Sequence, residues 1–163
     1  MSFWRSKEFA SKRCLAMLVK STRFGSISVS QEDVIYFPTG LIGFENTRHW
    51  LILGDHGSPD VVWLQSTTQP QLALPLISPR KFLPDYKVSL SHRQVSALQL
   101  RSNDRLFVLL VLSKTGKTLT ANLRGPILVN LTGRLAIQTV VSDSLPLALP
   151  LVQGHAGSLR AAA

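Results

Sequence analysis

The chain has 163 residues, of which 45% are hydrophobic, 17% charged and 7% aromatic. This length is enough for one globular domain whose core needs neither a disulfide nor a structural metal. Cys14 is the single cysteine, so no disulfide forms within the chain and we expect a reducing, cytoplasmic setting. The longest hydrophobic runs, such as residues 106–112, fall far short of the about 20 residues that span a bilayer as a helix, which excludes a helical membrane protein.

Basic residues outnumber acidic ones by 18 to 9, which gives a net charge of +9. The excess is uneven, because residues 1–23 contain six Lys and Arg but only one acidic residue, Glu8. A basic balance favours attraction to nucleic acid, anionic lipid or an acidic protein, and it is also typical of an ordinary solvated surface. Charge therefore does not by itself identify a partner.

Composition divides the chain into three parts. Residues 1–17 are basic and Ser-rich, which predicts an N-terminal extension that is disordered or forms a short amphipathic helix; its hydrophobic stretch is too short for a secretory signal. Residues 18–145 contain the predicted β domain. Residues 146–163 are rich in proline, glycine and small residues, which predicts a flexible C-terminal tail.

Short β-rich segments bounded by Gly, Pro, Asn, Asp and Ser dominate the predicted domain. The polar and apolar alternation of residues 26–30 predicts a strand, and we expect it to form a hairpin with residues 34–37. Further strands are predicted at 50–53, 61–64, 72–77, 106–112, 118–122, 127–131 and 135–141. Nine strands in one small domain indicate an all-β barrel or sandwich.

Two local features qualify this pattern. Pro75 cannot donate a ladder hydrogen bond, so its segment is expected at a sheet edge, at a bulge or outside the sheet. One helix is predicted, with Ser91 as its N-cap and residues 92–100 following, and with Leu90, Val95 and Leu98 facing inward.

The sequence offers little chemistry for catalysis, and we predict no enzyme activity, no cofactor and no metal site. The four histidines, at positions 49, 56, 92 and 155, have no second His or Cys at metal-ligand spacing. Asp55 and His56 lie in a Gly- and Pro-containing loop, where a hydrolase role has no further support. Residues 113–118 end in GKT, but position 111 is Val rather than Gly, so they predict a hairpin turn around Gly116.

Direct RNA binding is the alternative that a basic β-barrel suggests, since such barrels combine aromatic platforms with basic grooves. In this chain Phe37, Trp50, Trp63 and Phe107 lie within apolar runs, where burial is the better interpretation. Direct nucleic-acid binding is therefore the minor alternative.

Residues 37–45, FPTGLIGFE, resemble the FPxGLxGF turn of the flagellar assembly factor family FliW. Further marks of that family follow in order: LQS at 64–66, a PxxxxPDY-like segment at 79–86, TANLxxPIxxN at 120–130, and Gln138. The ordered set covers about residues 18–141. The resemblance implies a noncatalytic cytoplasmic protein with a compact antiparallel β-barrel-like fold and one short helix, which binds flagellin and the RNA-binding regulator CsrA. Flagellin export would free the factor to capture CsrA and relieve repression of flagellin synthesis.

Most motif residues have a simple structural interpretation, as turn formers or core residues such as Phe44, which we expect to fill the core. The residues assigned to fold maintenance are Phe37, Pro38, Gly40, Gly43, Phe44, Pro84, Asp85, Tyr86, Pro126 and Gln138. Three polar residues expected to be exposed, Gln65, Asn122 and Asn130, are the candidate partner contacts. Two features depart from the family: the basic net charge, which disfavours steering toward a basic CsrA surface, and the N-terminal extension.

Overall fold

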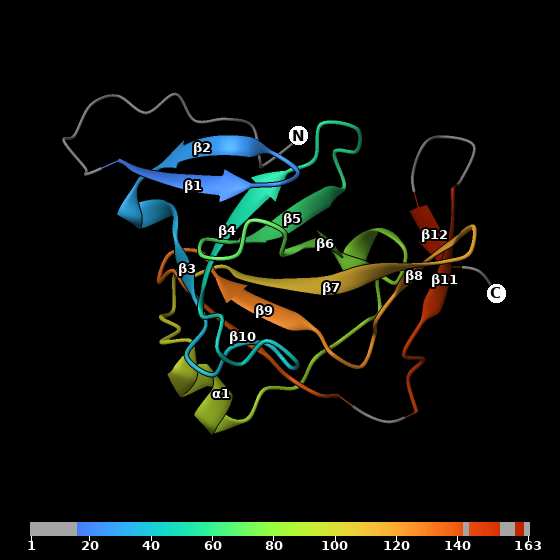
Figure 1. The fold of residues 1–163 in the computed structure, drawn as a ribbon. Helices are drawn as coiled ribbons and strands as arrows, with labels where there is room; N and C mark the ends of the chain where they lie inside the picture. The colour runs from blue at the N-terminus through green and yellow to red at the C-terminus, as the bar shows by residue number, and fades with distance from the viewer. Residues whose placement is uncertain (1–15, 142–143, 154–158, 162–163) are drawn as a thin grey trace.

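The computed structural model describes residues 16–141, 144–153 and 159–161, and these residues form mostly strands (Figure 1). The strands are β1 (Met17–Ser21), β2 (Gly25–Val29), β3 (Ile35–Tyr36), β4 (His49–Gly54), β5 (Val61–Ser66), β6 (Ala73–Ile77), β7 (Leu106–Thr115), β8 (Thr118–Ala121), β9 (Ile127–Asn130), β10 (Leu135–Gln138), β11 (Leu149–Gln153) and β12 (Leu159–Ala161). Within these ranges there is one α-helix, α1 (His92–Ala97), and there are 3-10 turns at Gln31–Asp33 and Pro79–Lys81. The expected all-β class with one short helix is confirmed.

Strand pairing closes a ring. The order runs β3, β4, β5, β6, β7, β9, β10 and back to β3. Every pair in the ring is antiparallel except β10 with β3, where Leu135 pairs with Tyr36 in parallel and the Tyr36 amide donates to the Arg134 carbonyl at 2.9 Å. Closure gives every strand of the ring a partner on both sides over part of its length, which stabilises the ring and limits pairing with other chains. The barrel-like prediction is therefore confirmed, with one parallel joint.

Alternating side chains fill the inside of the ring. On β4, Trp50 belongs to the inner cluster, whereas the next residue, Leu51, packs against the β1–β2 hairpin outside the ring. This is the period of two that a strand imposes on its side chains. The buried members of the inner cluster are Ile35, Phe37, Leu41, Trp50, Val62, Leu64, Leu76, Leu109, Ile127, Val129 and Ala136.

The expected hairpin between residues 26–30 and 34–37 is wrong. β2 pairs instead with β1, in a two-stranded sheet that lies over the ring (Figure 1). The Asp33 carboxylate accepts a 2.8 Å hydrogen bond from the Ser30 amide, which closes a 3-10 turn and redirects the chain. Ile35 can then pair with Trp50 of β4. β1 was not predicted from the sequence, because its residues were divided between the predicted extension and the start of the predicted domain.

The predicted helix is confirmed, although it ends earlier than expected. The Ser91 side chain accepts a hydrogen bond from the Gln94 amide and the Gln94 side chain accepts one from the Ser91 amide, which forms a capping box. Leu98, directly after the helix, packs with Leu128 and Ile137 on the outside of β9 and β10.

The segment expected to be a flexible tail contains strands. β11 pairs with β8, and Leu151 is buried in the cluster that also contains Leu112 and Leu123. β12 pairs with β11. Proline is tolerated here because β12 pairs with β11 only at Leu151–Gln153, so Pro150 pairs with β8 alone. The helix or disorder expected for the extension falls on residues outside the described ones, except for Ala16 and Met17, of which Met17 begins β1.

β6 and β7 diverge soon after they pair. β6 pairs with β7 only at Leu76 and Ile77, so Pro75 lies at a local edge, as expected. β7 continues into the turn before β8, where Gly116 has a φ of +62°. The GKT segment is therefore a hairpin turn followed directly by the strand β8, not by the helix that a phosphate-binding loop requires.

Leu98 should be an anchor of the fold, because it is fully buried where the helix meets the ring. We expect Leu98→Ala to lower the free energy of unfolding by about 2–5 kcal/mol, through lost burial and the cavity left behind. Val140→Ala is the control, since Val140 is 65% exposed, and its effect should be below about 0.5 kcal/mol. Urea denaturation measures both, and equal effects would contradict this assignment.

Candidate functional site

The loop between β3 and β4 presents two hydrophobic side chains to solvent. Ile42 is 62% exposed and Phe44 is 37% exposed, whereas Leu41 in the same loop is buried. The expectation that Phe44 fills the core is therefore wrong. The Phe44 amide donates to the Leu41 carbonyl at 2.8 Å, and this tight turn leaves the core position to Leu41. Residues 40–45 are called the docking loop below.

Two glycines allow the docking loop to turn. Gly40 has a φ of +71° and Gly43 a φ of +86°, both in the region that favours glycine. At Gly40 space is also limiting, because a Cβ atom would lie 2.5 Å from the carbonyl oxygen of Glu45. The Gly43 amide donates to the Glu45 carboxylate at 2.8 Å, and this bond, followed by one from the Glu45 amide, lowers the pKa of Glu45.

Gln138 joins the docking loop to a second motif. Its side-chain oxygen accepts a hydrogen bond from the Ile42 amide at 2.9 Å, and its side-chain nitrogen donates to the Gly125 carbonyl at 3.1 Å. Gly125 lies in the crossover between β8 and β9. One side chain at the end of β10 therefore holds two segments that are distant in sequence.

Asn122 organises that crossover. Its side-chain oxygen accepts hydrogen bonds from the Arg124 amide at 2.9 Å and the Gly125 amide at 3.2 Å. The Tyr86 hydroxyl donates to the Leu123 carbonyl at 2.6 Å, and burial raises the pKa of Tyr86 to about 12. Three of the segments singled out in the sequence thus meet at one end of the ring.

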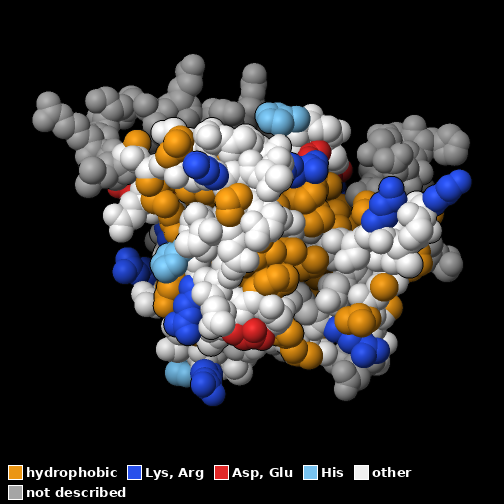
Figure 2. Space-filling model, viewed as in Figure 1, with side chains coloured by type: hydrophobic (Ala, Val, Ile, Leu, Met, Phe, Trp, Pro, Cys, Tyr) orange, Lys and Arg blue, Asp and Glu red, His pale blue; other side chains and the backbone are white. Residues whose placement is uncertain are grey.

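A hollow of about 160 Å³ lies beside the docking loop. Hydrophobic side chains also gather near the centre of the face shown in Figure 2, where β6 and β7 lie. The hollow beside the docking loop is lined by Leu41, Ile42, Phe44, Leu74, Val111, Asn122 and Gln138. The hollow is thus largely hydrophobic, with two side-chain amides at its rim, which suits a protein contact better than chemistry on a small molecule.

Two of the three candidate contact residues are not exposed. Gln65 is fully buried, where it accepts from the Ser21 hydroxyl at 2.6 Å and donates to the Leu72 carbonyl at 3.1 Å. Asn130 is also fully buried and donates to the Leu98 carbonyl at 3.0 Å and to the Asp104 carboxylate at 2.9 Å. Their burial contradicts the exposure that was expected of them. Only Asn122 is partly exposed and lies beside the docking loop.

The remaining motif residues have mixed environments. Phe37 is fully buried and contacts Trp50 edge-on, with ring centroids 6.2 Å apart, and Pro38 leads the chain from it into the docking loop. Pro126 is buried in the crossover. Pro84 and Asp85 are exposed and lie in a turn in which the Tyr86 amide donates to the Leu83 carbonyl at 3.0 Å.

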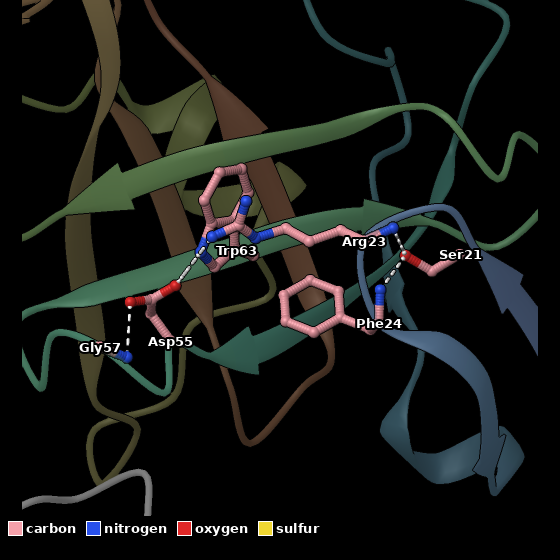
Figure 3. Close-up of polar contacts among 6 residues, drawn as sticks. All are labelled: Ser21, Arg23, Phe24, Asp55, Gly57 and Trp63. Carbon is pink, nitrogen blue, oxygen red and sulfur yellow. Dashed lines mark hydrogen bonds and ion pairs between the residues drawn. The ribbon is translucent and has the colours of Figure 1, made fainter.

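The Asp55 carboxylate accepts hydrogen bonds from neighbouring residues. Its carboxylate accepts from the Trp63 indole at 2.8 Å, from Arg23 at 3.2 Å and from the Gly57 amide at 3.0 Å (Figure 3). Burial raises the pKa of Asp55, but these hydrogen bonds outweigh it and keep the pKa below its usual value. His56 is exposed, so the geometry does not assemble the acid–base pair considered from the sequence.

Comparison with known proteins shows the family of this chain. A sequence model described as FliW protein matches residues 18–151. The chain belongs to the FliW family. "Flagellar assembly factor FliW" of Bdellovibrio bacteriovorus is 36% identical over 130 residues, covering 78% of this chain and 74% of the relative. The FliW relative from Natranaerobius thermophilus is 35% identical over 132 residues, covering 78% of this chain and 87% of the relative.

A solved FliW structure shows the same fold. "Crystal structure of the flagellar assembly factor FliW" matches with a TM-score of 0.72 and 25% identity, covering 78% of this chain and 90% of that chain. Within the part of this FliW chain that the structure describes, no helix is both long and apolar enough to cross a membrane. In the same residues no three His, Cys, Asp or Glu side chains lie close enough together to hold a metal ion.

Gly40 should be the most restricted of the glycines with positive φ in this FliW chain. We expect Gly40→Ala to lower the free energy of unfolding by about 2–4 kcal/mol, because the new methyl group meets the Glu45 backbone and the φ is unfavourable. Gly116→Ala is the control, since Gly116 has a similar φ of +62° but nothing within 4 Å of the added atom. The Gly116→Ala substitution should lower the free energy of unfolding by about 1 kcal/mol, as measured by thermal or urea unfolding. A Gly116→Ala effect equal to that of Gly40→Ala would contradict the packing argument.

Proposed function

We propose that this chain is a noncatalytic, cytoplasmic flagellar assembly factor that binds flagellin through the docking loop. The observation that carries the proposal is the exposure of Ile42 and Phe44 on a loop fixed by Gln138. Relatives that are 35–36% identical are named flagellar assembly factors, which supports a flagellar role.

The physical argument is that of a preorganised contact. Large hydrophobic side chains at the centre of an interface dominate binding energy, and a loop that is already ordered loses little entropy when it binds. The docking loop has both properties, since its amides are held by Glu45 and Gln138 and its hydrophobic side chains face outward. Asn122 and Gln138 add polar groups at the rim of the adjacent hollow.

The proposal includes antagonism of CsrA by exchange of partners. If flagellin and CsrA bind exclusively and with comparable affinity, mass action makes the amount of free CsrA depend on the amount of free flagellin. The net charge of +9 does not favour attraction to a basic regulator. The contact with CsrA should therefore depend on hydrophobic complementarity more than on steering by charge.

Ile42 should be an anchor for flagellin. We expect Ile42→Asp to weaken binding to flagellin of the same organism by at least about tenfold, because it places a charge at the centre of a hydrophobic contact. Leu18→Asp is the matched control, because Leu18 on β1 is 65% exposed, close to the 62% of Ile42. Its effect should stay within about twofold. Isothermal titration calorimetry measures both affinities.

Failure of the unaltered protein to bind flagellin at low and high salt would contradict the proposed function. An equal loss of flagellin affinity in the Ile42→Asp and Leu18→Asp variants would instead contradict the assignment of flagellin binding to the docking loop. Salt also distinguishes this contact from charge-driven binding of RNA, whose affinity falls steeply with ionic strength.

A further inference from the structure

A second hollow lies between two turns on the outer side of the ring. It measures about 330 Å³ and lies between the β1–β2 turn and the β7–β8 hairpin. Its lining residues are Arg23, Asp55, Val61, Trp63, Pro75, Leu112, Ser113, Lys114 and Leu119. Pro75 and Leu112 directly follow Leu74 and Val111 of the docking-loop hollow, so their side chains point to the opposite face of their strands. The two hollows are thus separate sites.

A fixed cation forms one edge of this second hollow. The guanidinium of Arg23 lies 3.7 Å from the ring centroid of Trp63 and bonds the Asp55 carboxylate at 3.2 Å (Figure 3). The Trp63 indole donates to the same carboxylate oxygen at 2.8 Å. The Ser21 hydroxyl accepts from the Arg23 and Phe24 amides at 3.2 and 3.1 Å, which holds the turn that carries Arg23. The arrangement fixes a positive group that is still 49% exposed.

The rest of the hollow is hydrophobic with a second cation at its rim. Val61, Trp63, Pro75 and Leu119 are partly exposed and supply a nonpolar floor. Lys114 is exposed, and in the described residues it has no ion pair. Because Arg23 compensates Asp55, the charge of Lys114 leaves the hollow positive.

We propose that this hollow is a docking site for a protein segment in which a hydrophobic side chain is flanked by acidic residues. The nonpolar floor takes the hydrophobic side chain, and Lys114, whose charge is not compensated in the hollow, attracts the acidic groups. This charge complementarity agrees with the net charge of +9. The inference is independent of the docking loop and of flagellin.

The observations favour a peptide over RNA. Binding of single-stranded RNA relies on aromatic faces that are open to stacked bases and on several cations along a groove. Here the face of Trp63 is covered by Arg23, and the floor is made of Val, Pro and Leu side chains as well as the indole. A small hydrophobic hollow with two cations fits a short protein segment.

The test uses the full chain and two synthetic peptides, one with leucines flanked by glutamates and one with lysine in place of each glutamate. The reporter is the NMR signal of the Trp63 indole N–H, which lies at the site. We expect the acidic peptide to shift this signal in a saturable way and the basic peptide to leave it unchanged. Lys114→Glu should lower the affinity for the acidic peptide about fivefold, because an attraction at the rim of the hollow becomes a repulsion.

Lys117→Glu is the matched control. Lys117 is exposed in the same hairpin but does not line the hollow, and the substitution changes the charge by the same amount. It should change the affinity by less than about twofold. No shift with the acidic peptide, equal shifts with both peptides, or equal effects of the two variants would overturn the proposal. An oligouridine that shifts the Trp63 signal when the acidic peptide does not would also overturn it and indicate RNA.

Discussion

The side-chain amide of Gln138 is the interaction on which the proposed docking site depends. It accepts from the Ile42 amide and donates to the Gly125 carbonyl, so it fixes the docking loop to the crossover that Asn122 organises. A hydrogen bond of this kind contributes about 0.5–1.5 kcal/mol to stability. With this bridge in place, the exposure of Ile42 and Phe44 becomes a fixed feature of the surface.

The closed ring makes such a bridge possible. β10 pairs with β9 and β3, so the end of β10 lies beside both the crossover before β9 and the loop after β3. Many acidic side chains of the described residues are used within the fold. Asp33 bonds the Ser30 amide, Glu45 the Gly43 amide, and Asp104 the Asn130 side chain. These carboxylates keep their negative charge, and the second hollow is positive because Lys114 lines it beside the paired Arg23 and Asp55.

The sequence predicted the strands well where a period of two or a turn residue marked them. The nine expected segments correspond to β2–β10, and Ser91 capped the one helix. It did not predict the pairing partner of β2, because the 3-10 turn after Ser30 depends on a side-chain bond that periodicity does not reveal. β11 was missed because Pro150 and the short length of the segment are typical of a tail, while its stability comes from pairing with β8.

The site was predicted less well than the fold. The motif located the docking loop, but Phe44 was assigned to the core because large aromatic residues are usually buried. The closely spaced Gly40 and Gly43 indicated a tight turn, but they did not indicate which of the neighbouring hydrophobic side chains face solvent. Gln65 and Asn130 were assigned to the surface because they are polar, yet both satisfy buried backbone groups.

The central claim is that the docking loop is rigid before any partner binds, and backbone NMR order parameters of the free protein test it most directly. We expect the amides of Ile42, Gly43 and Phe44 to have order parameters of about 0.85, equal to those of the ring strands. Values below about 0.6 at these three amides, with the strands remaining ordered, would contradict the account.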